Sequence, residues 1–287
     1  ALLASGMISW IDEETIESYY KVMDGLRIAP ATERLHLVYS PLNGTGNVPV
    51  REMMKRMGNI DVEIVAEQEN PDGHFPTCPY PNPEIREAMK LAKDAGFEGI
   101  ELALGADGEI SMTSTDEELL SIKAYAEELG IKIPSLSSGL CWANSLTAND
   151  PEERQRAFDM VVRQLYCAKM IGAETILVIP GSVSVEFVPE WGVVDYDVVY
   201  ERALEQAKKL AKVAEEYGVQ IGFENVWNKF LLSPLEMRQF IDAVGSDMVG
   251  VYFDTGNVVF SGYPEHWINI LGKRIKKVHF KDYRRDP

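Results

Sequence analysis

The sequence predicts an α/β protein folded as a (β/α)8 barrel, and three observations lead to that fold class. From residue 84 onward, six amphipathic helices alternate with six short β-rich runs. Strict alternation of this kind requires parallel strands with helices packed on the sheet. Two further strands are expected in the first 83 residues, and they bring the total to eight, the number that closes such a barrel. An incomplete barrel beside a small α/β lobe is the alternative arrangement.

The first 83 residues contain the two additional strands. We expect a helix at 12–28, a strand at 35–42, a Gly-rich turn that begins at Asn43, a helix at 48–58 and a strand at 61–68. A Pro-rich loop then leads into the alternating part of the chain. This loop is the linker-like stretch of the sequence.

The later helices and strands follow one another in a regular order. Helices are expected at 85–96, 116–130, 151–172, 200–218, 234–245 and 264–274. Strands are expected at 97–104, 131–138, 173–180, 219–226, 248–257 and 275–282. Five helices end at a glycine, the residue that best tolerates a left-handed C-terminal cap. Asp116, Asp150 and Ser233 are expected as N-caps.

The composition is that of a globular protein and excludes several classes of function. Apolar residues make up 46% of the 287 residues, enough for a sizeable core. A net charge of −17 argues against nucleic acid as a partner. No run approaches the roughly 20 apolar residues of a membrane span, and the opening residues lack a basic signal-peptide region. We therefore expect a cytoplasmic protein with no membrane partner, and reduced thiols at Cys78, Cys141 and Cys167.

Three motifs in the first 84 residues resemble a known family. The run VYSPLNGTGNVPVREMMKRMG at 38–58, with PDGHFP at 71–76 and PNPE at 81–84, resembles the second domain of phosphoglucomutases and phosphomannomutases. The resemblance covers residues 1–84 and departs from the family at Asn43, where the family usually has His. The phosphoserine loop, the Asp-rich metal loop and the phosphate-binding domain of that family have no counterpart in this sequence.

Four later motifs resemble a second family. They are GIEL at Gly99, FENVWNKF at Phe223, YFDTGN at Tyr252 and VHFKD at Val278, each at the end of an expected strand. In this order they are similar to the xylose isomerase-like TIM barrel superfamily, and to its sugar phosphate isomerase/epimerase group, which includes D-tagatose 3-epimerase. The resemblance covers residues 85–287 and lacks the family's first and last strands.

The two resemblances meet near Pro83, so the sequence has the form of a chimera of two fragments. We expect a phosphohexomutase-like α/β segment at 1–84 and a xylose isomerase-like barrel segment at 85–287. The two early strands are then candidates to close the barrel.

Three residues predict a metal site. Glu224, Asp254 and His279 each end an expected strand and are separated by 30 and then 25 residues, about one βα unit each time. In a parallel barrel these strand ends converge on one face. Two carboxylates and an imidazole suit a divalent cation such as Mn²⁺, Mg²⁺, Co²⁺ or Zn²⁺.

The second resemblance implies an activity for this site. It is that of a divalent-metal-dependent sugar or sugar-phosphate isomerase or epimerase, which moves a proton beside the carbonyl of a ketose through an enediolate. By the same resemblance Glu224 is both ligand and proton-transfer base, and Asp254 and His279 are ligands. A second Glu, which the family carries on its last strand, is lacking, so we expect a partial site and impaired turnover.

Five further residues are candidates for binding the substrate, a small-molecule sugar or sugar phosphate. The resemblance places Arg285 on substrate oxygens, and Lys281 lies in the same motif region. Asn257 stands where the family often has His. Trp142 and Trp227 lie in loops after strands, where stacking on a sugar and ordinary packing are both open.

Two alternatives to the isomerase or epimerase remain open at this point. One is a non-catalytic chimeric scaffold that folds and binds a metal or sugar without turnover. The other, ranked lower, is a phosphohexomutase-type phosphotransferase. Assembly into a homo-oligomer is also left open by the sequence.

Overall fold

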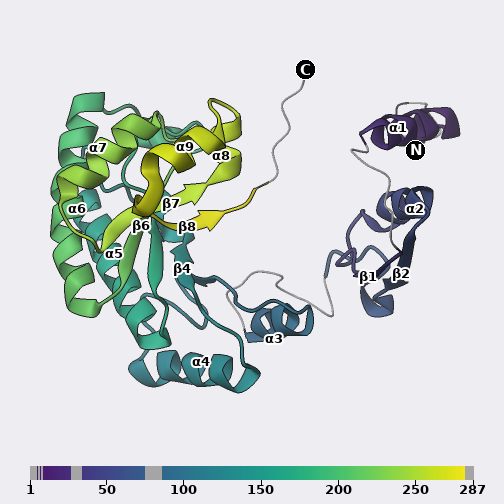
Figure 1. The fold of residues 1–287 in the computed structure, drawn as a ribbon, viewed down its shortest axis with the longest axis horizontal. Helices are drawn as coiled ribbons and strands as arrows, with labels where there is room; N and C mark the ends of the chain where they lie inside the picture. The colour runs from purple at the N-terminus through teal and green to yellow at the C-terminus, as the bar shows by residue number, and fades with distance from the viewer. Residues whose placement is uncertain (1–4, 6, 8, 27–33, 75–85, 282–287) are drawn as a thin grey trace. The chain divides into compact units, whose positions relative to one another are not determined.

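The computed structural model describes residues 5, 7, 9–26, 34–74 and 86–281, and the chain divides into two compact units, Ala1–Pro81 and Asn82–Pro287 (Figure 1). Within the described residues, β1 and β2 form a two-stranded sheet and β3 to β8 form a six-stranded sheet. Closure of a barrel by the first pair of strands stays a prediction.

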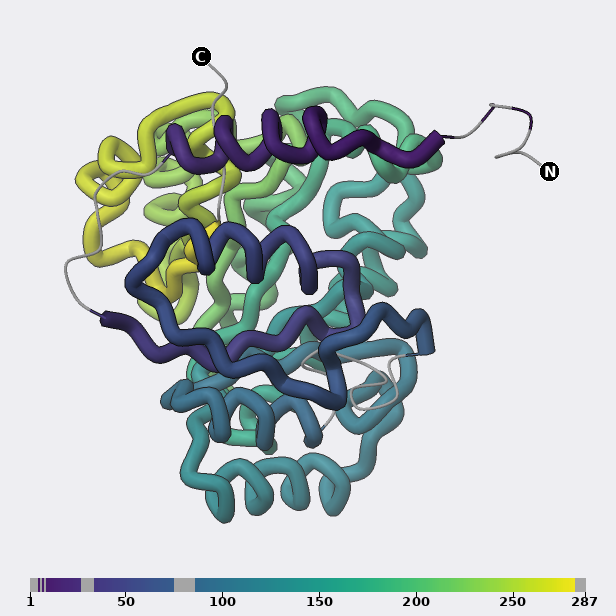
Figure 2. Tube along the Cα trace, turned by 90° about the vertical axis from the view of Figure 1, so that its right-hand side faces the viewer, coloured from purple at the N-terminus to yellow at the C-terminus, as the bar shows by residue number. Residues whose placement is uncertain are grey.

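The first unit is a small α/β arrangement. Its elements are α1 (Glu13–Gly25), β1 (Leu35–Tyr39), α2 (Asn47–Met57), β2 (Ile60–Ile64) and the 3-10 turn Ala66–Gln68. The two strands are parallel, α2 packs on β2, and α1 lies along α2 (Figure 2). Arg56 joins the two helices because it pairs with Glu17 at 2.6 Å and lies 4.7 Å from the ring centroid of Tyr20. The expected elements of this segment are confirmed, with shorter strands.

The second unit alternates helices and parallel strands as expected. Its elements are α3 (Arg86–Asp94), β3 (Leu102–Leu104), α4 (Asp116–Leu129), β4 (Ser135–Ser138), α5 (Pro151–Ile171), β5 (Thr175–Val178), α6 (Tyr196–Tyr217), β6 (Gln220–Glu224), α7 (Pro234–Val244), β7 (Val249–Asp254), α8 (Thr255–Val259), α9 (Pro264–Leu271) and β8 (Ile275–His279). Neighbouring strands in the sheet are neighbours in sequence, and helices α5 to α7 cover one face of it (Figure 1). This is the topology of consecutive strands of a (β/α)8 barrel.

The hydrophobic core lies between the sheet and these helices. Phe223 of β6 meets Phe240 of α7 with ring centroids 5.8 Å apart, and Phe253 of β7 stacks on Trp267 of α9 at 6.1 Å. Successive strand residues point to opposite faces, so Tyr252 projects to the other side of the sheet. That second face carries the polar side chains of the site described below.

A buried glutamine joins two strands beyond the end of their ladder. Gln164 of α5 is 1% exposed, and its Nε2 donates to the carbonyl oxygens of Leu136 (2.9 Å) and Leu177 (3.1 Å). The backbone pairing of β4 and β5 ends at Leu136 and Ile176. Gln164 therefore donates from its buried side chain to one carbonyl on each of the two strands.

The structure confirms most of the expected helix caps and corrects one. Asp150 and Ser233 are N-caps. The prediction of Asp116 as the N-cap of α4 is wrong, because Thr115 occupies that position and forms a capping box with Glu118. The five glycines expected as C-terminal caps all have positive φ, namely Gly96, Gly130, Gly172, Gly218 and Gly245.

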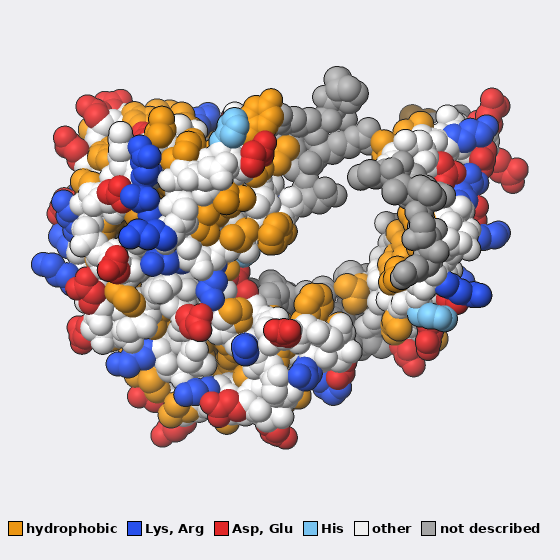
Figure 3. All heavy atoms as spheres, viewed as in Figure 1, with side chains coloured by type: hydrophobic (Ala, Val, Ile, Leu, Met, Phe, Trp, Pro, Cys, Tyr) orange, Lys and Arg blue, Asp and Glu red, His pale blue; other side chains and the backbone are white. Residues whose placement is uncertain are grey.

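Charged side chains of both signs are intermixed on the face of the second unit seen in Figure 3. No helix among the described residues combines the length and the apolar character that a membrane crossing requires.

Candidate metal centre

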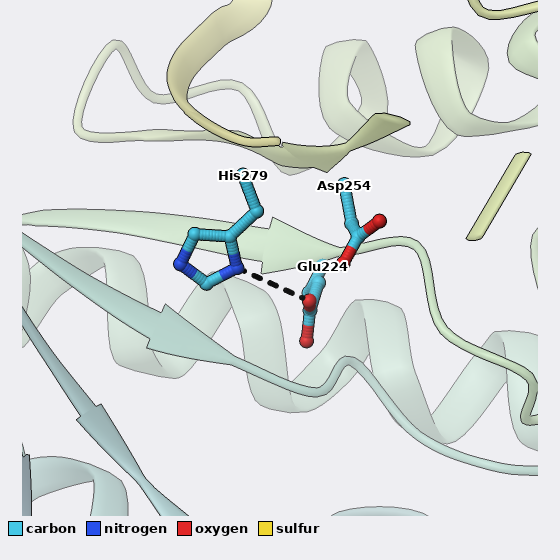
Figure 4. Close-up of side chains that lie close together, drawn as sticks. All are labelled: Glu224, Asp254 and His279. Atoms are coloured by element: carbon cyan, nitrogen blue, oxygen red, sulfur yellow. Dashed lines mark ion pairs between the residues drawn. The ribbon is translucent and has the colours of Figure 1, made fainter. Parts of the chain in front are cut away.

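The three predicted ligands end three adjacent strands. Glu224, Asp254 and His279 are the last residues of β6, β7 and β8, and Asp254 pairs in register with His279 (Figure 4). One ligand atom from each lies within 4.8 Å of the other two. The structure thus brings the predicted triad together.

A short helix fixes the position of Asp254. The carboxylate Oδ1 of Asp254 accepts the backbone N–H of Asn257 at 2.8 Å and so caps α8. Residues 255–257 belong to this helix, so the prediction that the strand extends to residue 257 is wrong. Asn225 forms a reciprocal pair with the backbone of Asp254, donating to its oxygen at 2.8 Å and accepting from its nitrogen at 2.9 Å. Asp254 is 4% exposed, so these contacts hold a buried carboxylate at the strand end.

His279 lies between two carboxylates. Its Nδ1 is 3.6 Å from Glu224 Oε1, and its Nε2 is 3.2 Å from Glu101 Oε1. The contacts with Glu101 and then with Glu224 raise the pKa of His279 to about 10. In the absence of an ion the ring therefore carries a proton on each nitrogen at neutral pH.

Glu224 is a largely buried carboxylate whose pKa is raised. Burial raises the pKa of Glu224, and the negative charges of Asp254 and Glu101 add to the rise, while His279 opposes it. A carboxylate with a raised pKa is better matched to abstracting a proton near neutral pH than an exposed one.

This donor set fits a divalent cation. Ligand atoms at about 2.0–2.2 Å from one ion lie up to roughly 4.4 Å apart, so small movements would bring the three atoms into range. Buried carboxylates repel one another, and a cation would offset that repulsion. Among the described residues the cluster offers three ligands, which suits Mn²⁺, Mg²⁺, Co²⁺ or Zn²⁺ with positions left for substrate or water.

Three of the five candidate substrate contacts form one connected group. Lys281 Nζ donates to Asn257 Oδ1 at 2.9 Å and lies 5.1 Å from the ring centroid of Trp227. Trp227 Nε1 donates to the carbonyl oxygen of Asn257 at 3.2 Å. Asn257 and Trp227 also line a pocket of about 430 Å³ together with Phe187 and Phe260.

Trp142 is not part of this group. Trp142 ends the 3-10 turn Gly139–Trp142 after β4 and packs against Phe187 at 4.8 Å and Trp191 at 6.2 Å between ring centroids. Trp142 thus reaches the pocket through Phe187. Arg285 lies outside the described residues.

Sequence reasoning missed several polar residues around the triad. Glu101 belongs to the GIEL motif but had no assigned role, and it contacts Ser135, Tyr252 and His279. Asn225, directly after Glu224, was also missed. Strand alternation could have indicated Tyr252, because Tyr252 is two residues before Asp254 and so lies on the same face of the sheet.

The family assignment follows from the match of most of the chain. Residues 89–287 match the family model of the xylose isomerase-like TIM barrel. The chain belongs to this family. Residues 17–111 match the model of the phosphoglucomutase/phosphomannomutase alpha/beta/alpha domain II. The two matches overlap at residues 89–111, which include most of α3 and the whole of β3.

Solved structures of the xylose isomerase-like kind share the fold. D-psicose 3-epimerase from Clostridium cellulolyticum H10, solved with D-tagatose, has a TM-score of 0.59 and 21% identity over 67% of this chain and 66% of that chain. An L-ribulose 3-epimerase has a TM-score of 0.57 and 19% identity over 68% of this chain and 65% of that one. At these identities the likeness shows the fold.

Curated relatives match parts of the chain. The inosose dehydratase of Lacticaseibacillus casei is 28% identical over 170 residues, which are 57% of this chain and 55% of that protein. The probable phosphomannomutase of Haemophilus influenzae is 32% identical over 82 residues, or 29% of this chain and 17% of that protein. The chain therefore spans about half or less of the length of these relatives.

Proposed function

We propose that this protein is a divalent-metal-dependent sugar or sugar-phosphate isomerase or epimerase. The observation that supports it is the convergence of Glu224, Asp254 and His279 at three adjacent strand ends. A divalent ion bound there would supply Lewis acidity toward the oxygens of a sugar and offset the negative charge that develops when a proton leaves carbon.

Each residue has a distinct part in this proposal. Glu224 takes the proton from the carbon beside the carbonyl, since its carboxylate is buried and has a raised pKa. Glu224, Asp254 and His279 together hold the ion. Lys281 and Trp227 lie in the neighbouring loops. Lys281 contacts the hydroxyls or the phosphate of the substrate, and Trp227 contacts the face of the sugar.

The names of the similar proteins favour a ketose as the substrate class. The neighbours include 3-epimerases of D-psicose and L-ribulose, and the relatives include inosose dehydratases. Epimerisation at carbon 3 and dehydration of a keto sugar both begin with loss of a proton next to a carbonyl. We therefore propose a ketose, free or phosphorylated, as the substrate.

Solvent deuterium exchange tests the proposal. The Mn²⁺-loaded protein in D₂O is expected to place deuterium beside the carbonyl of one of D-fructose, D-tagatose, L-ribulose or their phosphates. Glu224→Gln should abolish the exchange, whereas Glu109→Gln, a carboxylate paired with Arg86 away from the triad, should retain it. Exchange in none of these sugars would support the non-catalytic scaffold instead.

We also propose that residues 1–84 and 85–287 are separate domains from two families. The division of the chain at Pro81 and Asn82 and the two family matches support this. Calorimetry should then record two unfolding transitions, of which only the larger shifts with Mn²⁺. A single transition would favour closure of one barrel by all eight strands.

A further inference from the structure

Glu101 lies directly before β3 and makes side-chain hydrogen bonds to three other strands. Its Oε2 accepts from Ser135 Oγ at the start of β4 and from Tyr252 OH of β7, both at 2.6 Å, and its Oε1 is 3.2 Å from His279 Nε2. Glu101 is therefore a hydrogen-bond acceptor held in place beside the triad.

The two carboxylates beside His279 contact different nitrogens of its ring. Nδ1 faces Glu224 of the triad at 3.6 Å, and Nε2 faces Glu101 at 3.2 Å. The ring also packs against Tyr252, with centroids 4.5 Å apart, which limits its rotation. The imidazole thus presents one nitrogen to the metal site and the other to Glu101.

This geometry determines the tautomer of His279 to which a metal ion would bind. A neutral imidazole carries one N–H and one lone pair, and an acceptor beside one nitrogen retains the proton there. With Glu101 at Nε2, the proton stays on Nε2 and the lone pair of Nδ1 points toward Glu224 and Asp254. An acceptor behind a metal-binding histidine also increases the basicity of the ligating nitrogen.

We propose that Glu101 is a positioning residue that fixes His279 in the Nε2–H tautomer, so that Nδ1 binds the metal ion. Ser135 and Tyr252 hold Glu101 in place for this purpose. The inference rests on the proposed metal site and adds to it a residue outside the ligand cluster. Glu101 acts through His279, since its two oxygens are already occupied by the imidazole and by two hydroxyl groups.

Mn²⁺ affinity of the stripped protein, measured by the EPR signal of free Mn²⁺, tests the inference. Loss of such an acceptor costs about 10–100-fold in metal affinity, and we expect this loss for Glu101→Ala. Glu101→Gln keeps an oxygen for Nε2–H and should recover most of the affinity. Glu109→Ala removes a comparable half-buried carboxylate that pairs with Arg86, and it should bind Mn²⁺ like the unmodified protein.

A second measurement reports the tautomer without reference to activity. In the Zn²⁺-loaded protein, ¹H–¹⁵N spectra of the imidazoles should show a slowly exchanging Nε2–H that disappears in His279→Asn. In Glu101→Ala the same proton should exchange rapidly with water. If that variant does not fold, Tyr252→Phe keeps the ring against His279, removes one donor to Glu101 and should weaken Mn²⁺ binding several-fold.

The outcomes separate this inference from the proposed function. Unmodified protein that binds no Mn²⁺ would overturn both. If the unmodified protein binds Mn²⁺ tightly, either of two results would overturn the positioning role alone. One is unchanged Mn²⁺ affinity together with unchanged Nε2–H protection in Glu101→Ala. The other is unchanged Mn²⁺ affinity in Tyr252→Phe.

Discussion

Asn225 and Asp254 form a reciprocal hydrogen-bonded pair across adjacent strand ends. Asn225 Nδ2 donates to the Asp254 carbonyl oxygen at 2.8 Å, and the Asp254 N–H donates to Asn225 Oδ1 at 2.9 Å. Asn225 follows Glu224 directly, so one residue connects the backbone of the proposed base to the backbone of a proposed ligand. The separation of two members of the triad is thereby fixed by a side-chain amide rather than by the sheet ladder alone.

Replacing this amide should weaken both the fold and the metal site. Asn225→Ala removes the partner of the buried Asp254 N–H and one donor to its carbonyl oxygen, and we expect a loss of about 1–3 kcal/mol in the free energy of unfolding and weaker Mn²⁺ binding. Asn228→Ala is the matched control, because Asn228 is also buried and donates to Gly181 O at 2.6 Å. Urea unfolding and Mn²⁺ titration measure both effects. Equal Mn²⁺ affinity in the two variants would show that the pair does not position Asp254.

The N-terminal cap of α4 allows a direct test of the corrected assignment. Thr115 Oγ1 accepts the Glu118 N–H at 3.3 Å, and Glu118 accepts the Thr115 N–H at 2.7 Å. Thr115→Ala should lower the free energy of unfolding by about 1 kcal/mol, and Asp116→Ala should lower it less. Urea denaturation of both variants measures this, and the reverse order would restore Asp116 as the cap.

Replacing the buried Gln164 of α5 should lower the free energy of unfolding by more than replacing the helix cap Thr115. Gln164→Met keeps a similar volume but leaves the carbonyl oxygens of Leu136 and Leu177 without their donor, which should cost roughly 1–3 kcal/mol. Gln155→Met on the same helix loses an exposed hydrogen bond to Asp159 and should change the unfolding free energy by less than about 0.5 kcal/mol. Similar urea midpoints for the two variants would contradict the role given to Gln164.

Cys167 should resist alkylation in the folded protein. Its side chain is fully buried on α5, and burial raises the pKa of the thiol to about 11. A higher pKa leaves less thiolate at a given pH, roughly 240-fold less at pH 8 than for an ordinary cysteine of pKa about 8.5. Mass spectrometry after iodoacetamide treatment should find Cys167 unmodified in native protein and modified in urea. Equal labelling in both conditions would contradict the buried placement.

Local sequence signals were sufficient for the longer helices, the order of the strands and the triad. Apolar periodicity and terminal glycines marked the helices, and Glu224, Asp254 and His279 each follow a β-rich run, so their positions on one sheet edge followed from the parallel topology. The expected strands were longer than those observed, because apolar residues such as Ile179 continue past the last ladder pair.

The same local signals could not predict contacts between residues that are far apart in the sequence. Glu101 meets Tyr252 and His279 across 151 and 178 residues, and no periodicity reports such a pairing. Thr115 and Asp116 are both good cap residues, and the choice depends on the extended backbone of Thr115 and the reach of Glu118. The helix Thr255–Val259 is too short to show an apolar repeat.

The central claim is that Glu224, Asp254 and His279 bind a divalent ion, and thermal unfolding of the EDTA-stripped protein with and without Mn²⁺ tests it most directly. A ligand that binds only the folded state at 100 times its Kd adds about 2.7 kcal/mol of stability. We predict a Mn²⁺-dependent rise in Tm that Glu224→Gln abolishes and Glu109→Gln retains. No rise in the unmodified protein, or an equal rise in Glu224→Gln, would contradict the account.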